Sequence, residues 1–181
     1  MCGFTGYLDP SRRDQPKLSQ QVIQNMTDCI VHRGPDSEGF WRDSLEEIVM
    51  GFRRLAILDI SEKGNQPMIS NSGQYVIVFN GEIYNHLDLR KSIQIDEPNI
   101  NWSSSSDTES LLAGFDLWGI EETIQNCTGM FSFAVWCNKN KVLTLGRDRL
   151  GEKPLYYGWQ GSEEQRVFLF GSELKSFHKH P

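Results

Sequence analysis

The residue with the most chemical potential in this sequence is a cysteine at position 2, which a glycine follows. If the initiator methionine is removed, Cys2 carries a free α-amine in addition to its thiol. An α-amine has a reference pKa of about 7.7 to 8.0, so near neutral pH it can take up the thiol proton and later return a proton to a leaving amine. One residue would then supply both nucleophile and base for opening an amide. A cysteine can also stand at position 2 by chance, so this residue taken alone does not establish a function.

Asn80 and Gly81 follow an apolar run and have two interpretations. Asn-Gly is a preferred hairpin turn, because both residues tolerate positive φ. In the alternative, the Asn80 side-chain amide and the Gly81 backbone N–H donate hydrogen bonds to the oxyanion of a tetrahedral intermediate. The dipeptide considered alone favours the turn.

Three charged residues could bind the two charged groups of an amino acid. Arg54 lies in an apolar segment, where a long cation either reaches the surface or finds a carboxylate, and both it and Arg53 could simply be solvated. A guanidinium can also hold an α-carboxylate through two parallel hydrogen bonds. For an α-ammonium, the candidate anions are Glu82 and Asp107. Asp107 at a helix start is equally explained by the helix dipole.

Metal chemistry is not indicated by this sequence. The four cysteines include no CxxC pair, the four histidines include no HExxH motif, and a glycine-rich phosphate loop is absent. We expect Cys29, Cys127 and Cys137 to be small core residues. His32 at a helix exit is explained by the helix dipole. We therefore predict no metal site.

Length and composition indicate one globular domain, with 181 residues of which 38% are hydrophobic and 23% are charged. The net charge of -6 without a basic cluster argues against a nucleic-acid partner. No apolar run approaches the roughly twenty residues that span a bilayer. Because the amino terminus also lacks a signal-peptide pattern, we expect no membrane association and a cytoplasmic location.

The elements expected to position these residues form an α+β pattern. Several strands follow one another without long helices between them, which predicts antiparallel sheet with helices packed on its faces. We expect helices from Ser19 to about Ile30, over about residues 86–93, and from a Ser106 cap to Gly119. Strands are predicted over residues 2–8, 48–52, 55–58, 75–79, 131–137, 141–145, 155–159 and 167–170.

Nine motifs, in order and nearly end to end, resemble the amidotransferase domain of glutamine-dependent asparagine synthetases. The opening Met-Cys-Gly-Phe-Thr-Gly, His-Arg-Gly-Pro-Asp and Phe-Asn-Gly-Glu-Ile-Tyr-Asn-His are three of them. The motifs cover residues 1–6, 32–36, 54–59, 66–67, 79–86, 106–109, 129–134, 147–158 and 172–175.

The resemblance implies the N-terminal nucleophile hydrolase fold, a four-layer α-β-β-α sandwich of two antiparallel sheets. It also implies hydrolysis of glutamine to glutamate and ammonia through a γ-glutamyl thioester. By resemblance, Cys2 is the nucleophile, Asn80 and Gly81 hold the oxyanion, Arg54 binds the α-carboxylate, Glu82 and Asp107 face the α-ammonium, and the backbone near Ile57 and Leu58 completes the glutamine pocket.

The resemblance further implies that residues 1–181 form one glutaminase domain. The synthetase domain, with its pyrophosphate loop for ATP, does not occur in this sequence. We therefore expect no cofactor for this domain, and ATP and Mg only for a synthetase domain or subunit that amidates aspartate with the ammonia. Alternative acceptors such as a sugar carboxylate, a catalytically silent glutamine-binding or regulatory module, and assembly as a homodimer stay open.

Overall fold

The computed structural model of the protein describes residues 1–57, 59–163 and 165–181, which form two antiparallel sheets packed face to face. The first sheet has the strand order β2-β3-β1-β9-β8 and the second has the order β4-β5-β6-β7. The strands are β1 (Gly3–Leu8), β2 (Ser37–Asp43), β3 (Ile48–Arg54), β4 (Met68–Ile69), β5 (Tyr75–Ile83), β6 (Gly129–Cys137), β7 (Val142–Arg147), β8 (Tyr156–Ser162) and β9 (Gln165–Gly171).

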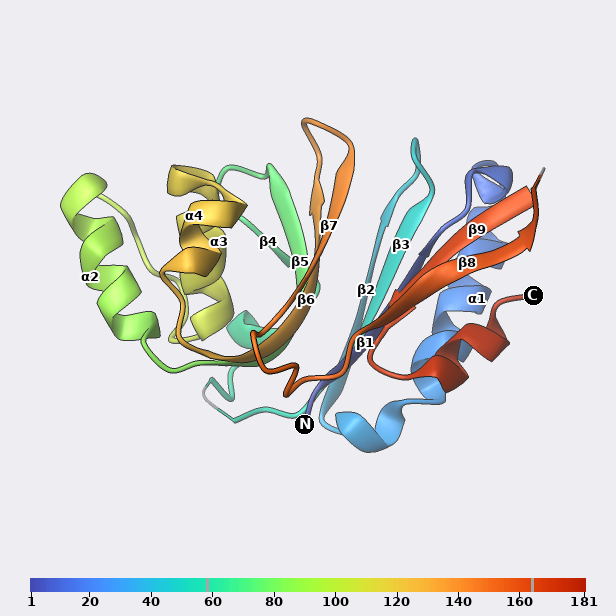
Figure 1. Cartoon of the computed structure of the whole chain (residues 1–181), viewed down its shortest axis with the longest axis horizontal. Helices are drawn as coiled ribbons and strands as arrows, with labels where there is room; N and C mark the ends of the chain where they lie inside the picture. Colours follow the sequence, from blue (N-terminus) through green and yellow to red (C-terminus); the bar gives the residue numbers. More distant parts are fainter. Residues whose placement is uncertain (58, 164) are drawn as a thin grey trace.

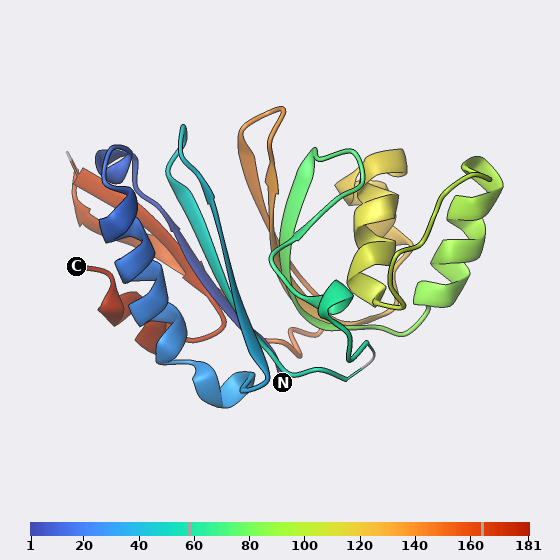
Figure 2. The same cartoon turned by 180° about the vertical axis from the view of Figure 1, so that it is seen from behind.

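Helices cover the outer face of each sheet. Helix α1 lies against the first sheet, α3 lies against the second, and α2 and α4 pack against α3 (Figures 1 and 2). This arrangement confirms the predicted four-layer α-β-β-α sandwich. The helices are α1 (Pro16–Asp28), α2 (His86–Asp96), α3 (Asp107–Trp118) and α4 (Ile120–Gln125), with short 3-10 helices at Pro10–Arg12, Val31–Arg33, Glu62–Gly64 and Leu174–Lys179.

The alternation of side chains along β5 shows how the core is divided. Val76 and Val78 belong to the apolar cluster between the sheets, whereas Ile77 and Phe79 pack toward the helices. Burial of each such side chain contributes about 1.5–3 kcal/mol, and because both faces are covered the strand is continuously apolar in sequence. The same alternation places Asn80 on the face of Val76 and Val78, toward the first sheet.

Strand β5 runs through Asn80 and Gly81, so the hairpin turn that the dipeptide favours in isolation is not formed. Gly81 lies opposite Phe131 of β6, and pairing continues to Ile83. A Cβ atom on Gly81 would lie 2.3 Å from the Met130 carbonyl oxygen. Glycine is therefore required here by the close approach of β6.

The predicted strand over residues 55–58 is wrong for residues 55–57, and Leu58 lies outside the described residues. Strand β3 ends at Arg54, because the paired part of β1 begins at Gly3, opposite Arg53. Beyond Arg54 the Ala56 backbone N–H donates to the Asp36 carboxylate at 2.8 Å instead of to a neighbouring strand.

Capping residues predicted the start of one helix correctly and that of another incorrectly. Ser106 caps α3 as predicted, since its hydroxyl accepts the Thr108 N–H at 3.2 Å. Helix α1 begins earlier than predicted, at Pro16, and the Ser19 hydroxyl donates to the buried Glu47 carboxylate.

Strands β2 and β4 and helix α4 were not predicted. Within the described residues every helix is too short or too polar to cross a bilayer.

Candidate active site

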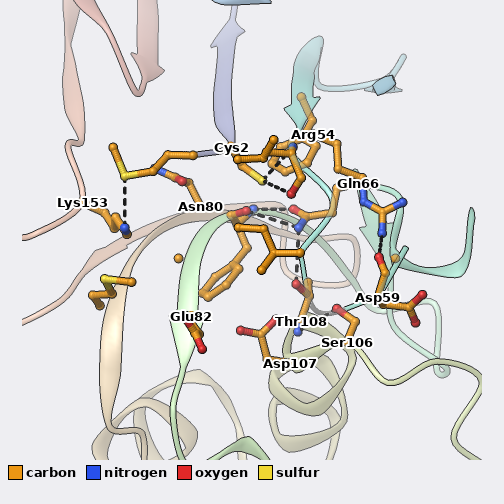
Figure 3. A pocket seen from close by; sticks show the side chains of 18 residues that line it. Cys2, Arg54, Asp59, Gln66, Asn80, Glu82, Ser106, Asp107, Thr108 and Lys153 are labelled. Carbon is orange, nitrogen blue, oxygen red and sulfur yellow. Dashed lines mark hydrogen bonds between the residues drawn. The ribbon is translucent and has the colours of Figure 1, made fainter. Parts of the chain in front are cut away.

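A cavity of about 150 Å³ lies at the end of the sandwich where the amino terminus, the end of β3, the end of β5 and the start of α3 meet (Figure 3). This volume is roughly ten times what one water molecule requires, so the cavity can accept a small molecule. Leu58 lies outside the described residues. All the other predicted site residues line this cavity: Cys2, Arg54, Ile57, Asn80, Gly81, Glu82 and Asp107.

Cys2 is positioned by the pairing of β1 with β3. Because Gly3 pairs with Arg53, the residue before Gly3 lies beside the chain leaving β3, and the Cys2 sulfur accepts the Leu55 N–H at 3.3 Å. Burial raises the pKa of the Cys2 thiol, although the Leu55 N–H, the positive chain terminus and Arg54 act in the opposite direction. A thiol with a raised pKa needs a base before it can act as a nucleophile.

Met1 occupies the edge of the cavity. Its sulfur accepts a hydrogen bond from the Lys153 ammonium at 3.2 Å, and its peptide bond acylates the Cys2 nitrogen. The amine that could serve as the base is thus formed only when Met1 is removed.

Asn80 contributes to the cavity a hydrogen-bond donor that has no acceptor among the described residues. Its position in β5 directs it toward the first sheet, and Cys2 packs against the same intersheet cluster from the opposite side. The side chain is 1% exposed, and its Nδ2 has no hydrogen-bond partner among the described residues. A buried donor without an acceptor costs about 1–3 kcal/mol, which an oxygen of a bound molecule could offset.

Arg54 is buried rather than solvated, and it organises the loop that follows β3. Its Nη1 donates to the Ser61 carbonyl at 2.7 Å and to Asn65 Oδ1 at 2.8 Å, and its Nη2 donates to the Asp59 carbonyl. A guanidinium has five N–H donors, so these contacts with described residues leave two for a carboxylate. Its neighbour Arg53 instead forms ion pairs with Asp28 and Glu38.

Asp107 combines both of its predicted roles. It is the first residue of α3, and its Oδ2 accepts the Ile83 N–H at 2.9 Å while the side chain lines the cavity. Burial raises the pKa of Asp107, the Ile83 N–H opposes this, and Glu82 nearby raises it further. A bound cation would stabilise the ionised form of Asp107. The half-buried Glu82 adds negative charge on the same side of the cavity.

Two cavity residues hold neighbouring segments in place; both lie in matched motifs, but the sequence assigned them no role. The Gln66 amide accepts the Phe79 N–H at 2.6 Å and donates to the Phe79 carbonyl at 3.2 Å, as a neighbouring strand would. The Asp59 carboxylate accepts the Ser61 hydroxyl at 2.6 Å, the Ser61 N–H at 2.8 Å and the Ser105 N–H at 3.0 Å, and these hydrogen bonds lower its pKa to about 2. Asp59 thereby ties the loop after β3 to the start of α3.

Lys153 reaches the cavity through a turn organised by Asp148. The two carboxylate oxygens of Asp148 accept backbone N–H groups of Phe131, Leu150, Glu152 and Lys153 at 2.9–3.1 Å. Although burial opposes ionisation, these hydrogen bonds lower the pKa of Asp148. The motif over residues 147–158 contained this turn, but no role could be assigned to Lys153 from its residue type alone.

The remaining candidates lie outside the site. Cys127 and Cys137 are buried as predicted, and Cys29 is half-buried. His32 lies in a short 3-10 helix, and its Nε2 contacts the Glu173 carboxylate at 2.8 Å. In the part of the chain that the structure describes, no group of three or more His, Cys, Asp and Glu side chains could hold a metal ion.

Comparisons with known proteins agree with this geometry. A family model described as a glutamine amidotransferase domain matches residues 1–181. Asparagine synthetase (glutamine-hydrolyzing) 3 of Bacillus subtilis is 40% identical over 183 residues, covering 100% of this chain and 28% of that protein. Asparagine synthetase (glutamine-hydrolyzing) 1 of the same organism is 41% identical, with coverage of 97% and 26%. These matches confirm the predicted resemblance.

The putative asparagine synthetase (glutamine-hydrolyzing) 2 of Methanocaldococcus jannaschii is 36% identical, with coverage of 97% and 34%. The chain thus spans only about a quarter to a third of the length of these relatives. Among solved structures, glutamine phosphoribosylpyrophosphate amidotransferase from B. subtilis aligns with a TM-score of 0.75 at 16% identity, covering 98% of this chain and 43% of that one. At this identity the likeness concerns the fold, and it confirms the predicted fold class.

Proposed function

Because the chain belongs to the glutamine amidotransferase family, we propose that Cys2 hydrolyses glutamine here and that the ammonia is used to make asparagine. The observation that carries the proposal is the arrangement in one cavity of a buried thiol and of Asn80 Nδ2, which has no hydrogen-bond partner among the described residues. Arg54 and Asp107 add a cation and an anion to this pair, as a zwitterionic amino acid requires (Figure 3).

Glutamine would be held at its backbone end by the charged residues. The α-carboxylate takes the two donors of Arg54 that the contacts with described residues leave over, and the α-ammonium lies against Asp107 and Glu82. Since burial raises the pKa of Asp107, the α-ammonium offsets an unfavourable feature of the empty site. The side-chain amide then extends toward Cys2 and Asn80.

The reaction begins after Met1 has been removed. The α-amine of Cys2 takes the thiol proton, the sulfur attacks the amide carbon, and the carbonyl electrons move onto oxygen, where Asn80 Nδ2 and the Gly81 N–H donate hydrogen bonds. When the tetrahedral intermediate collapses, the C–N bond breaks and the α-ammonium of Cys2 returns its proton to the leaving nitrogen, giving ammonia and a γ-glutamyl thioester. Water, deprotonated by the same amine, attacks the thioester and releases glutamate.

The acceptor of the ammonia is proposed from the relatives. Their names describe glutamine-hydrolysing asparagine synthetases, and most of their length lies outside the region this chain matches. We expect a synthetase domain or subunit, with ATP and Mg of its own, to activate aspartate in the cytoplasm. Assembly as a homodimer stays a prediction.

Exposed apolar side chains at the cavity end of the molecule support the proposal of such a partner. The loops that follow β3, β5 and β7 lie beside the amino terminus (Figure 1) and expose Ile60, Tyr84 and Leu150, at 84%, 56% and 85% exposure. Exposed apolar side chains on loops near a site are available for a second protein to cover, and we propose that these three form part of such a contact. A synthetase domain seated there would receive ammonia without loss to the solvent.

The proposed activity is tested on protein from which mass spectrometry shows that Met1 has been removed. We expect this protein to release equal amounts of glutamate and ammonia from glutamine, and we expect Cys2→Ala to bind glutamine without turnover. Equal, negligible release by the processed wild type and by Cys2→Ala would contradict the proposal and favour a silent glutamine-binding module.

A further inference from the structure

Lys153 is a buried cation, and the hydrogen-bond acceptor that it has among the described residues is a weak one. The residue is 6% exposed and lines the cavity, and its ammonium donates to the Met1 sulfur at 3.2 Å. None of the ion pairs formed by described residues includes Lys153. The nearby carboxylate of Asp148 is already occupied by four backbone N–H groups, one of them from Lys153 itself.

A buried ammonium is costly unless it is paired, and a thioether is only a weak acceptor. The proposed mechanism requires removal of Met1, which takes this acceptor away. The mature site would then hold a lysine beside newly opened space. A cation in that position calls for a negatively charged group of the bound molecule.

The position of Lys153 indicates which group this is. In Figure 3 Lys153 and Arg54 lie on opposite sides of Cys2 and Asn80, so the α-carboxylate held by Arg54 is directed away from Lys153. The opposite end of the substrate is its γ-amide. During hydrolysis this group changes from a neutral amide through an oxyanion to the γ-carboxylate of glutamate.

We propose that Lys153 forms an anion subsite that binds the γ-carboxylate of glutamate and, before it, the oxyanion of the tetrahedral intermediate. This assignment rests on the proposed glutaminase function. Lys153 discriminates by charge: it adds little to the binding of neutral glutamine and more to each anionic species. Interactions that strengthen as charge develops are those that accelerate a reaction, and here they also retain the product.

The test compares two ligands that differ only at the γ-group. In a Cys2→Ala protein lacking Met1, which cannot turn over, the Kd values of glutamine and glutamate are measured by calorimetry. We expect an additional Lys153→Met change to weaken glutamate roughly tenfold or more, the scale of a hydrogen bond to a charged group, while glutamine changes much less. Lys153→Arg should retain the preference, and Lys153→Gln is a second neutral variant should the methionine variant fold poorly.

Lys91, exposed and paired with Asp88 on α2, provides a matched control, since Lys91→Met should leave both Kd values unchanged. Equal weakening of glutamine and glutamate, or no weakening of either, would overturn the Lys153 assignment alone. A Cys2→Ala parent that binds neither amino acid would contradict the proposed function and the Lys153 assignment with it.

Discussion

The Cys2 sulfur lies 3.3 Å from the backbone nitrogen of Leu55, whose N–H it accepts. This contact joins the first residue of the proposed mature chain to the loop that leaves β3. The same loop is held by Arg54 and, through Asp59, by the start of α3. The position of the nucleophile therefore depends on the pairing of β1 with β3 and on the order of this loop.

Replacement of Asn80 by alanine tests the oxyanion donor. Because Asn80 Nδ2 is buried and unpartnered among the described residues, its loss should leave the fold intact and lower kcat about 100- to 1000-fold. Steady-state kinetics on processed protein measures this. Asn138, whose Nδ2 donates to the Gly73 carbonyl near the β6–β7 hairpin, is the matched control, and Asn138→Ala should keep full activity. Comparable kcat values for both variants would exclude the assigned role.

Asp107 should make glutamine binding depend on pH. Burial raises its pKa, so the folded protein holds this proton more tightly than the unfolded chain does, and the contribution of Asp107 to stability falls as pH rises through that range. An α-ammonium favours the ionised form. Glutamine affinity should therefore weaken as pH falls through the raised pKa.

Calorimetric titration of glutamine into Cys2→Ala protein, from neutral into acidic conditions, measures this dependence. Adding Asp107→Asn should give weaker binding that is nearly flat over the same range, whereas Glu82→Gln should keep the acid-dependent loss. An unchanged pH profile in the Asp107→Asn variant would show that another group controls it.

Asp59→Asn tests the tether between the loop after β3 and Ser105. Its pKa is lowered to about 2, so the stability it provides is present above the unfolded value and is lost only as pH falls through about 2. At neutral pH the substitution should loosen the loop whose carbonyl groups hold Arg54. We expect KM to rise roughly tenfold, the scale of a hydrogen bond to a charged group, with little change in kcat. Asp88→Asn on α2 is the control, and an unchanged KM for Asp59→Asn would argue against the tether.

Gly81→Ala should destabilise the fold through a steric collision. The added Cβ would meet the Met130 carbonyl oxygen at 2.3 Å, which forces β5 and β6 apart at about 1–3 kcal/mol. Urea unfolding measures the change in free energy. Gly158 in β8 has no heavy atom within 4 Å of an added Cβ, so Gly158→Ala should unfold close to the wild type. Equal stability of both variants would contradict the steric argument.

Elements with complete local signals could be predicted from the sequence. Ser106 caps α3 and Gly119, with φ of +86°, ends it. Element limits that depend on a partner strand could not be predicted. The Asn-Gly pair reads as a turn on its own, yet β6 extends the pairing to Ile83. The capping signal at Ser19 likewise failed because its hydroxyl has a buried acceptor in Glu47.

In the candidate site, too, some residues could be predicted from the sequence and others could not. Asn80, Arg54 and Asp107 were reached through the motifs around them. Gln66 and Lys153 also lie in matched motifs, but no role could be assigned to them, because their roles depend on contacts distant in sequence, with Phe79 and with Met1. A residue type alone does not reveal that a lysine is buried with no carboxylate partner in the described part of the chain.

The central claim is that removing Met1 creates a Cys2 whose amine activates its own thiol. An electrophilic glutamine analogue, followed by peptide mass spectrometry, tests it most directly, with the half-buried Cys29 as an internal reference. We predict stoichiometric labelling of Cys2, prevented by glutamine, in processed protein and not in protein that retains Met1. Absence of label on Cys2 after processing, or equal labelling with Met1 in place, would contradict the account.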